Sequence, residues 1–272
     1  MQSLLSRASK SLLSRFNLDS ISHSLLPGSC SLCQSPLKAS NGALCHRCIA
    51  ELPRLTRHCQ RCSVPLASDS LCGSCQLRPP TYNRCISAFH YQSPVDNIIL
   101  RLKNDPYTVE VKQLSAVLAD SIATTYQRVQ LPCPETIIPL PLHWLKMTKR
   151  GFNQSYIISG LLAGHLRREH NINTEIRSDI CQRIIMGQEQ HLLSAKKRLT
   201  SIKNAFTIEP ECPSGTKTLA GLSVAGLSVA VVDDVVTTGA TANSVATALL
   251  RAGAAQVDIW SIARTSWNNS TG

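Results

Sequence analysis

The stretch VVDDVVTTGAT at residues 231–241 decides the fold of this 272-residue chain. An apolar, β-branched run enters two adjacent carboxylates and then a turn rich in threonine and glycine. A helical pattern follows at 241–252 and ends at Gly253, and a further strand is expected at 256–263. A strand, loop, helix and strand in succession predict an α/β fold, with a parallel sheet flanked by helices on both faces.

The turn in this stretch has the properties of a phosphate site. Its N–H groups open a helix, where the helix dipole favours negative charge, and Gly239 permits close backbone approach. Three hydroxyl groups lie in the same turn. The expected phosphate contacts are Thr237, Thr238, Gly239, Ala240 and Thr241. The alternative is purely structural, with a buried strand end and a capping aspartate before the helix.

Two acids precede the turn, where a ribose would lie beyond the phosphate. Carboxylates accept hydrogen bonds from ribose hydroxyls, and they help to hold Mg²⁺ on a pyrophosphate. Adjacent acids at the carboxyl end of a parallel strand are costly unless they are used. Asp233, Asp234 and Val235 are therefore expected to contact the sugar of a Mg²⁺-bound sugar phosphate.

Eight cysteines form four CxxC pairs in the first third of the chain. A CxxC turn places two thiolates on one side, and two such turns complete a tetrahedral zinc site. The simplest pairing is sequential, although the spacing leaves an interleaved one open. The sequential ligand sets are Cys30, Cys33, Cys45 and Cys48 for one zinc and Cys59, Cys62, Cys72 and Cys75 for the other. No ligand position remains open for catalysis, so both ions are expected to be structural; redox-active dithiols are the alternative.

Charge is unevenly distributed along the chain. The formal net charge is +11, of which residues 1–90 contribute +7. Two tetrathiolate zinc sites would lower the total to about +7. A basic half is compatible with nucleic-acid contact, but aromatic residues at 4% provide few stacking platforms.

The first 29 residues are predicted to form an amphipathic lead-in helix, with Leu5, Leu12 and Phe16 on one stripe. It would dock on the protein's own core or, alternatively, on a membrane surface. No apolar run resembles a signal peptide, and the run at 219–232 is too short to cross a bilayer. The sequence thus predicts a cytoplasmic protein without a membrane span.

Four regions are expected along the chain. The lead-in at 1–29 precedes a cysteine-rich double zinc ribbon at 30–78, the α/β domain spans 85–266, and a tail follows at 267–272. Within the α/β domain, strands are expected at 85–91, 135–142 and 227–232. Helices are expected at 94–102, 111–128 and 154–168.

These motifs together resemble a known family. VVDDVVTTGAT resembles the motif that binds 5-phosphoribosyl pyrophosphate (PRPP) in type I phosphoribosyltransferases, and the whole chain resembles the ComF/GntX family. IIPLPLHWLKMTKRGFNQS at 137–155 resembles the family's strand and RGFNQ signature. The R…Q…L…R…NAF pattern is matched by Arg183, Gln190, Leu192, Arg198 and Asn204-Ala205-Phe206. The tandem CxxC pairs resemble the family's double zinc ribbon.

The resemblance implies a type I phosphoribosyltransferase-like sheet that binds PRPP with Mg²⁺. On the pyrophosphate side it implies Lys149, Arg150, Gly151, Asn153 and Gln154, which otherwise read as a basic surface loop and a helix start. It also implies a mobile hood carrying Gln190 and Arg198, where exposed helix charges are the alternative.

For function, the resemblance implies competence-type DNA uptake, processing or utilisation, with single-stranded DNA and DNA-uptake or recombination proteins as partners. An active phosphoribosyltransferase on an unidentified base or nucleotide is the first alternative, and a PRPP-sensing adaptor without turnover is the second. Purine-salvage transferases carry an aspartate base where this chain has Thr237, which takes no proton at neutral pH. Purine salvage is therefore disfavoured, and no catalytic residue is assigned.

Overall fold

The computed structural model describes residues 28–37, 42–183, 206–208 and 224–266. Contacts divide the chain into two compact units, Met1–Glu51 and Leu52–Gly272. The expected lead-in helix, the hood residues Gln190 and Arg198 and the tail lie outside the described residues. The boundaries expected from the sequence, at 30–78 and 85–266, stay a prediction.

The first unit holds the first two CxxC pairs. Strands β1 (Gly28–Ser29) and β2 (Pro36–Leu37) pair antiparallel, and helix α3 (His46–Ala50) follows. Cys45 caps this helix, because its sulfur accepts a hydrogen bond from the backbone N–H of Cys48. A strand pair and a short helix thus present cysteines from two turns.

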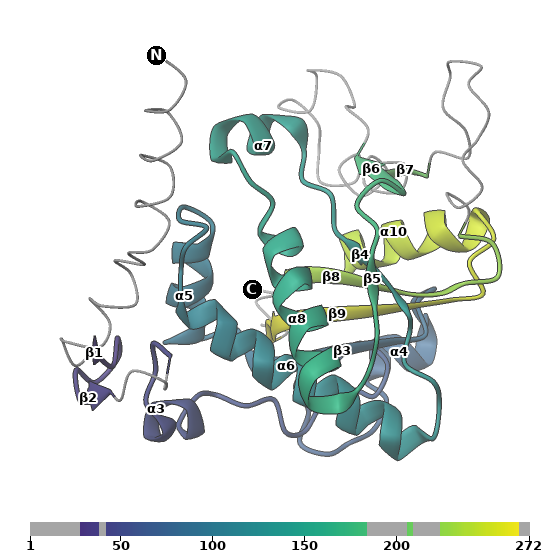
Figure 1. Ribbon diagram of the computed structural model, residues 1–272. Helices are drawn as coiled ribbons and strands as arrows, with labels where there is room; N and C mark the ends of the chain where they lie inside the picture. Colours follow the sequence, from purple (N-terminus) through teal and green to yellow (C-terminus); the bar gives the residue numbers. More distant parts are fainter. Residues whose placement is uncertain (1–27, 38–41, 184–205, 209–223, 267–272) are drawn as a thin grey trace, which may run out of the picture. The chain divides into compact units, whose positions relative to one another are not determined.

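The second unit is built on a five-stranded parallel sheet (Figure 1). Its strand order is β3-β9-β8-β4-β5, and all four neighbouring pairs run parallel. The strands are β3 (Arg84–His90), β9 (Gln256–Arg264), β8 (Ser228–Val236), β4 (Thr136–Pro139) and β5 (Glu175–Ile176). The predicted α/β fold with a parallel sheet is confirmed.

Helices cover both faces of this sheet. Connections between parallel strands are right-handed, so a connection that runs toward β5 and one that runs toward β3 place their helices on opposite faces of the sheet. The connections that run toward β5 contain α6 (Glu110–Val129) and α8 (Gln154–His170), which pack together on one face, as Figure 1 shows. The connection from β8 to β9 runs toward β3 and contains α10 (Ala240–Arg251), on the other face.

Periodicity explains the helices. In α5 (Val95–Leu102), four apolar residues recur at the spacing that places them on one face, and all are fully buried: Val95, Ile98, Ile99 and Leu102. Helix α6 ends at Gln130, which takes the left-handed conformation common after a helix.

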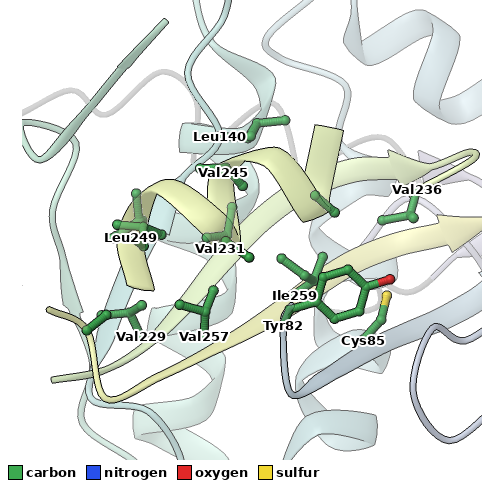
Figure 2. Close-up of a cluster of buried hydrophobic side chains, with 14 of the residues drawn as sticks. Tyr82, Cys85, Leu140, Val229, Val231, Val236, Val245, Leu249, Val257 and Ile259 are labelled. Atoms are coloured by element: carbon green, nitrogen blue, oxygen red, sulfur yellow. The ribbon is translucent and has the colours of Figure 1, made fainter. Parts of the chain in front are cut away.

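The core between α10 and the sheet is apolar on every side (Figure 2). The strands contribute alternating residues, because every second side chain of a strand points to the same face. Val229 and Val231 come from β8, Val257 and Ile259 from β9, Val245 and Leu249 from α10, Cys85 from β3, and Tyr82 from the segment that enters β3.

Two strand predictions were wrong in extent. Strand β8 does not stop at residue 232 but continues to Val236, because its ladder with β9 persists through the pairs Asp233↔Ser261 and Val235↔Ala263. Strand β4 ends at Pro139 rather than at 142. The basic stretch that follows, for which a surface loop was the alternative reading, forms helix α7 (Trp144–Arg150), capped by His143 and closed by Gly151 in the left-handed conformation.

A small antiparallel pair completes the described chain. Strands β6 (Cys181–Arg183) and β7 (Phe206–Ile208) pair so that Arg183 lies opposite Phe206. These two residues are the first and last of the R…NAF pattern. The two ends of the pattern therefore lie on paired strands, while all 22 residues between them lie outside the described part.

Candidate functional site

The candidate site lies where the connections that leave two neighbouring strands run in opposite directions. Strands β8 and β4 are neighbours, yet the chain leaves β8 toward α10 on one face and leaves β4 toward α8 on the other. Connections that diverge in this way open a crevice at the carboxyl ends of the two strands, and ligands of open α/β sheets bind there. The two aspartates and the turn after β8 are at this crevice, opposite the segment that enters α8.

The aspartates contact both sides of the crevice. Ser155, in the first turn of α8, lies with Oγ 3.4 Å from Oδ1 of Asp233. The ammonium of Lys103, just after α5, lies 3.0 Å from Oδ2 of Asp234. Asp234 is only 5% exposed, and Asp233 is partly buried. The pair is therefore held between α5, α8 and the strand end.

The two carboxyls titrate in opposite directions. Burial, followed by the negative charge of Asp234, raises the pKa of Asp233 well above its ordinary value. Burial also disfavours the charged form of Asp234, but hydrogen bonding with Asp233 and the charge of Lys103 outweigh it, so the pKa of Asp234 is lowered. The two carboxyls therefore titrate as a coupled pair, in which Asp234 ionises more readily than Asp233.

The turn after the strand is open. Thr237 and Thr238 are exposed, and Gly239, Ala240 and Thr241 are partly buried. Gly239 has a φ of 79°, which an L-residue adopts only with strain, so glycine is needed at this position. The hydroxyl of Thr238 accepts from the N–H of Ala240 at 3.3 Å. The turn thus leads directly into α10, where unpaired N–H groups are available to an anion.

The opposite side of the crevice is basic. Lys149 and Arg150 form the last turn of α7, and Nη1 of Arg150 donates to Oε1 of Gln154 at 2.5 Å. Gly151 turns the chain with a φ of 78°. Asn153 has structural bonds of its own. Its amide donates to the carbonyl of Leu140 at 3.0 Å, while its Oδ1 caps α8.

The cysteines gather into two groups of four. Within each group, Cys30, Cys33, Cys45 and Cys48 or Cys59, Cys62, Cys72 and Cys75, every sulfur lies within 4.8 Å of the others. The sulfurs of Cys33 and Cys45 are 3.7 Å apart, as are those of Cys62 and Cys72. A tetrahedral ion with bonds of about 2.3 Å spaces its sulfurs about 3.8 Å apart, so both groups fit zinc. The sequential pairing is confirmed.

Ionisation also favours metal binding. Burial alone would raise the pKa of Cys30, but the backbone N–H groups around it lower the pKa to about 6. In the second group, N–H donors likewise outweigh burial and lower the pKa of Cys59 to about 7. Burial raises the pKa of Cys62 to about 12. The hydrogen bond with Ser35 lowers the pKa of Cys33 as well. Each group therefore contains at least one thiol that ionises more readily than a free cysteine, and cation binding releases protons from thiols that are still protonated.

Comparison with known sequences identifies this architecture. A family model described as a double zinc ribbon domain matches residues 21–76. The chain is 33% identical over 241 residues to the DNA utilization protein YhgH of Salmonella typhi, covering 88% of this chain and 98% of that relative. The chain belongs to the ComF/GntX family. Competence protein F of Haemophilus influenzae, another relative, is 30% identical over 87% of this chain and 90% of its own length. The resemblance drawn from the motifs is confirmed.

Solved structures of hypoxanthine phosphoribosyltransferases are similar at low identity. The Trypanosoma cruzi transferase is 17% identical, with a TM-score of 0.33 over 56% of this chain and 63% of that one. The Staphylococcus aureus transferase is 14% identical, with a TM-score of 0.30 over 56% and 61%. The sheet of this ComF/GntX-family chain is assigned from its own strand order and register. No helix among the described residues is long and apolar enough to cross a membrane.

Three residues of this ComF/GntX-family site were missed by sequence reasoning. Lys103 and Ser155 contact the aspartates, and Arg264 donates to the backbone carbonyls of Val236 and Thr237, where β8 ends and the turn begins. Lys103 and Arg264 lie far from the signature stretches along the chain, so only the fold brings them close. Ser155 ends the RGFNQS segment, and its place in the first turn of α8 could have indicated its role.

A third cluster of side chains of the types that can bind metals lies elsewhere, on α6 and α8. The Nε2 atoms of His165 and His170 lie 3.0 and 2.8 Å from the same Oδ1 of Asp120. The three side chains satisfy one another. The candidate site of this ComF/GntX-family protein remains the crevice between β8 and β4.

Proposed function

We propose that the crevice binds PRPP with Mg²⁺ and that the protein uses this ligand while it handles incoming single-stranded DNA in the cytoplasm. The 5-phosphate would bind at the turn of residues 237–241. The ribose hydroxyls would bind at Asp233 and Asp234, and Val235 lies between them and the turn.

The observation that carries this proposal is the position of the acidic pair and the turn at the divergence of β8 and β4. A phosphate favours N–H groups and a helix N-terminus, whereas sugar hydroxyls favour carboxylates. The structure presents these two environments side by side on consecutive residues. A sugar phosphate, which carries its phosphate and its hydroxyl groups on one sugar ring, matches this arrangement.

Charge on the other side of the crevice supports a pyrophosphate. Lys103 follows α5 and contacts Asp234, while Lys149 and Arg150 end α7, just before α8 begins. A pyrophosphate brings several negative charges next to two acids, so its binding requires cations from the protein and Mg²⁺. Gln154 carries the Arg150 contact into the first turn of α8.

A role with single-stranded DNA is supported by α7 and its surroundings. Lys146 and Lys149 are exposed on this helix, and Trp144 and Tyr156 are exposed to 46% and 52%. Cations that neutralise phosphates, next to aromatic rings on which bases stack, are the elements of single-strand binding. The names of the relatives, DNA utilization protein and competence protein, point the same way. DNA-uptake or recombination proteins are the partners that such a role would require.

Calorimetry tests the proposal directly. PRPP with Mg²⁺ is titrated into the zinc-loaded protein, alone and with a poly-dT oligonucleotide at two salt concentrations. We expect saturable PRPP binding that is lost in the double variant Asp233→Asn/Asp234→Asn, and oligonucleotide binding that weakens as salt rises. Absence of oligonucleotide binding at low ionic strength removes the DNA part of the proposal.

A second candidate function is phosphoribosyl transfer, which one cavity favours. A cavity of about 720 Å³ adjoins the crevice next to Asn153, and its walls include the aromatic side chains of Trp144, Phe152 and Tyr156. Such a cavity suits a planar acceptor. Thr237 still provides no base for a purine, so the acceptor would be of another class. Release of pyrophosphate from PRPP with a panel of bases and nucleotides tests this function; binding without release favours a PRPP-sensing adaptor.

A further inference from the structure

Arg264, the last residue of β9, lies buried between the second zinc ribbon and the phosphate turn. It is 1% exposed. Its Nε donates to the carbonyl of Cys62 at 2.9 Å. Its Nη1 donates to the carbonyl of Val236 at 3.0 Å and also to the carbonyl of Thr237. One guanidinium therefore connects a residue of the second cysteine group to the last residue of β8 and the first residue of the turn.

These bonds orient the turn. In a trans peptide the carbonyl oxygen and the amide hydrogen point in opposite directions. Because the carbonyls of Val236 and Thr237 face Arg264, the N–H groups of Thr237 and Thr238 face away from it. These are the first two N–H groups of the turn proposed to hold the phosphate. Thr265 adds to this arrangement, since its hydroxyl donates to the carbonyl of Thr237 at 3.3 Å.

A second connection runs from the ribbon to α10. The backbone N–H of Thr81 donates to Oδ1 of Asn243 at 2.7 Å, and its hydroxyl lies 3.1 Å from that of Thr247. The next residue, Tyr82, is buried with its hydroxyl close to Gly239, at 3.5 Å from where a Cβ would lie. The segment between the ribbon and β3 therefore packs against the turn and the start of its helix.

The second cysteine group is also part of the sheet's core. Cys59, Cys62 and Cys75 are buried in the same apolar cluster as Val245 and Leu249 of α10. The first group, in contrast, belongs to the separate unit Met1–Glu51. The two candidate zinc sites have the same kind of ligands. They differ because the second group packs in the core of the sheet and its Cys62 carbonyl accepts a hydrogen bond from Arg264.

We propose that Arg264 is a positioning residue. Through it, zinc bound at Cys59, Cys62, Cys72 and Cys75 holds the turn of residues 237–241 in the conformation that binds phosphate, so only this zinc site supports ligand binding. A metal bound at Cys62 would fix the turn between Cys59 and Cys62, and with it the carbonyl that accepts the hydrogen bond from Arg264. The inference rests on the proposed binding of PRPP at the turn. It adds that the two zinc sites differ in their effect on that binding.

The first test compares one ligand variant from each site, Cys48→Ser and Cys75→Ser. Each is expected to retain one zinc by mass spectrometry. In Cys75→Ser, hydrogen exchange of the peptide covering 236–241, measured without ligand, should rise by roughly tenfold. Its affinity for PRPP with Mg²⁺ should fall by about tenfold or more. In Cys48→Ser both quantities should match the wild type.

The second test changes Arg264 itself and keeps both zinc ions. Arg264→Met fills the same space without donors, and Arg264→Lys retains the charge but cannot reach the carbonyls of Cys62 and Thr237 together. Both should show two zinc ions, faster exchange at 236–241 and weaker PRPP binding, with the lysine variant less affected. Arg177→Met, at an arginine bonded to Asp179, is the matched control and should change neither.

Two outcomes overturn the inference. One is a folded Cys75→Ser protein with wild-type exchange and affinity. The other is the same result for folded Arg264→Lys, which remains informative if the methionine variant fails to fold. If the wild type itself does not bind PRPP, the proposed function fails, while exchange at 236–241 without ligand still decides whether the second zinc site orders the turn.

Discussion

The ammonium of Lys103 lies 3.0 Å from Oδ2 of Asp234, and the carboxyl of the neighbouring Asp233 holds a raised pKa. The charge of Lys103 therefore acts on both acids, because it favours ionisation of Asp234 directly and of Asp233 more weakly. The cation favours the charged form of Asp234, and burial beside that charge disfavours ionisation of Asp233. A ligand that brings Mg²⁺ would meet one carboxyl that ionises readily and one that ionises less readily.

The contribution of Lys103 can be measured by Lys103→Met. Removal of the cation leaves Asp234 buried without its partner, so the pair should hold its proton more firmly and bind PRPP with Mg²⁺ about tenfold less tightly, or roughly 1.4 kcal/mol. Calorimetry at pH 7 measures the change. Lys112→Met, at an exposed lysine of α6, is the control. Equal affinity of both variants would show that Lys103 does not support the site.

Asp233 is predicted to cost stability in the unliganded protein. Its pKa is raised on folding, so above about pH 4 the unfolded chain ionises first and gains stability relative to the native state. Asp233→Asn should therefore raise the stability by on the order of 1 kcal/mol near pH 7, or about 2–4 °C in Tm.

The pH dependence checks the sign of this effect. The advantage of Asp233→Asn should shrink as the pH falls and vanish below about pH 3, where Asp233 is protonated in both states. Thermal unfolding of both proteins from about pH 3 to 8 measures it. A wild type that is more stable than the variant at neutral pH would contradict the raised pKa.

Far from the site, Asp258 on β9 is a fully buried carboxyl held by Tyr126 and Arg84. The Tyr126 hydroxyl hydrogen bonds to Oδ2 of Asp258, and Nε of Arg84 lies 3.4 Å from the same oxygen. Tyr126→Phe removes the donor but not the acid, so it should destabilise the protein by about 2–3 kcal/mol. Urea unfolding measures the loss. Tyr107→Phe, at a tyrosine that is 84% exposed, should change stability by less than about 0.5 kcal/mol.

Zinc content tests the cysteine groups. Metal analysis of untagged protein should give two zinc ions per chain, and Cys33→Ser or Cys72→Ser should each lower the number to one, because each removes one of four ligands. His46→Gln should keep two, since the first group already has four thiols. A single zinc ion in the wild type would mean that one group does not hold metal.

Local chemistry explains what the sequence could predict. The zinc ligands lie within 20 residues of one another, so the spacing of Cys30 and Cys48, or of Cys59 and Cys75, restricts the geometry. The alternation in β8 and the buried face of α5 follow from periodicity in the same way. The turn between β8 and α10 was likewise readable, because a strand end, two acids, a glycine and a helix start are consecutive, while its role in phosphate binding stays a prediction.

Long-range contacts escaped prediction. Nothing at position 264 or 103 marks these residues along the chain, and their roles arise because β9 ends beside β8 and α5 ends beside Asp234. The sequence also suggested a ribbon separate from the sheet, yet Arg264 bonds the ribbon's Cys62, and Ser63 bonds the carbonyl of Cys85 at 2.6 Å. The extent of β8 was underestimated, because acids disfavour strands and only the pairing with β9 sustains them.

The most direct test of the central claim is the heat of binding of PRPP with Mg²⁺ at pH 7, with wild type and Asp233→Asn/Asp234→Asn compared at matched zinc content. The account predicts one saturable site per chain in the wild type and none in the double variant. Absence of binding in the wild type, or equal binding in both proteins, would contradict it.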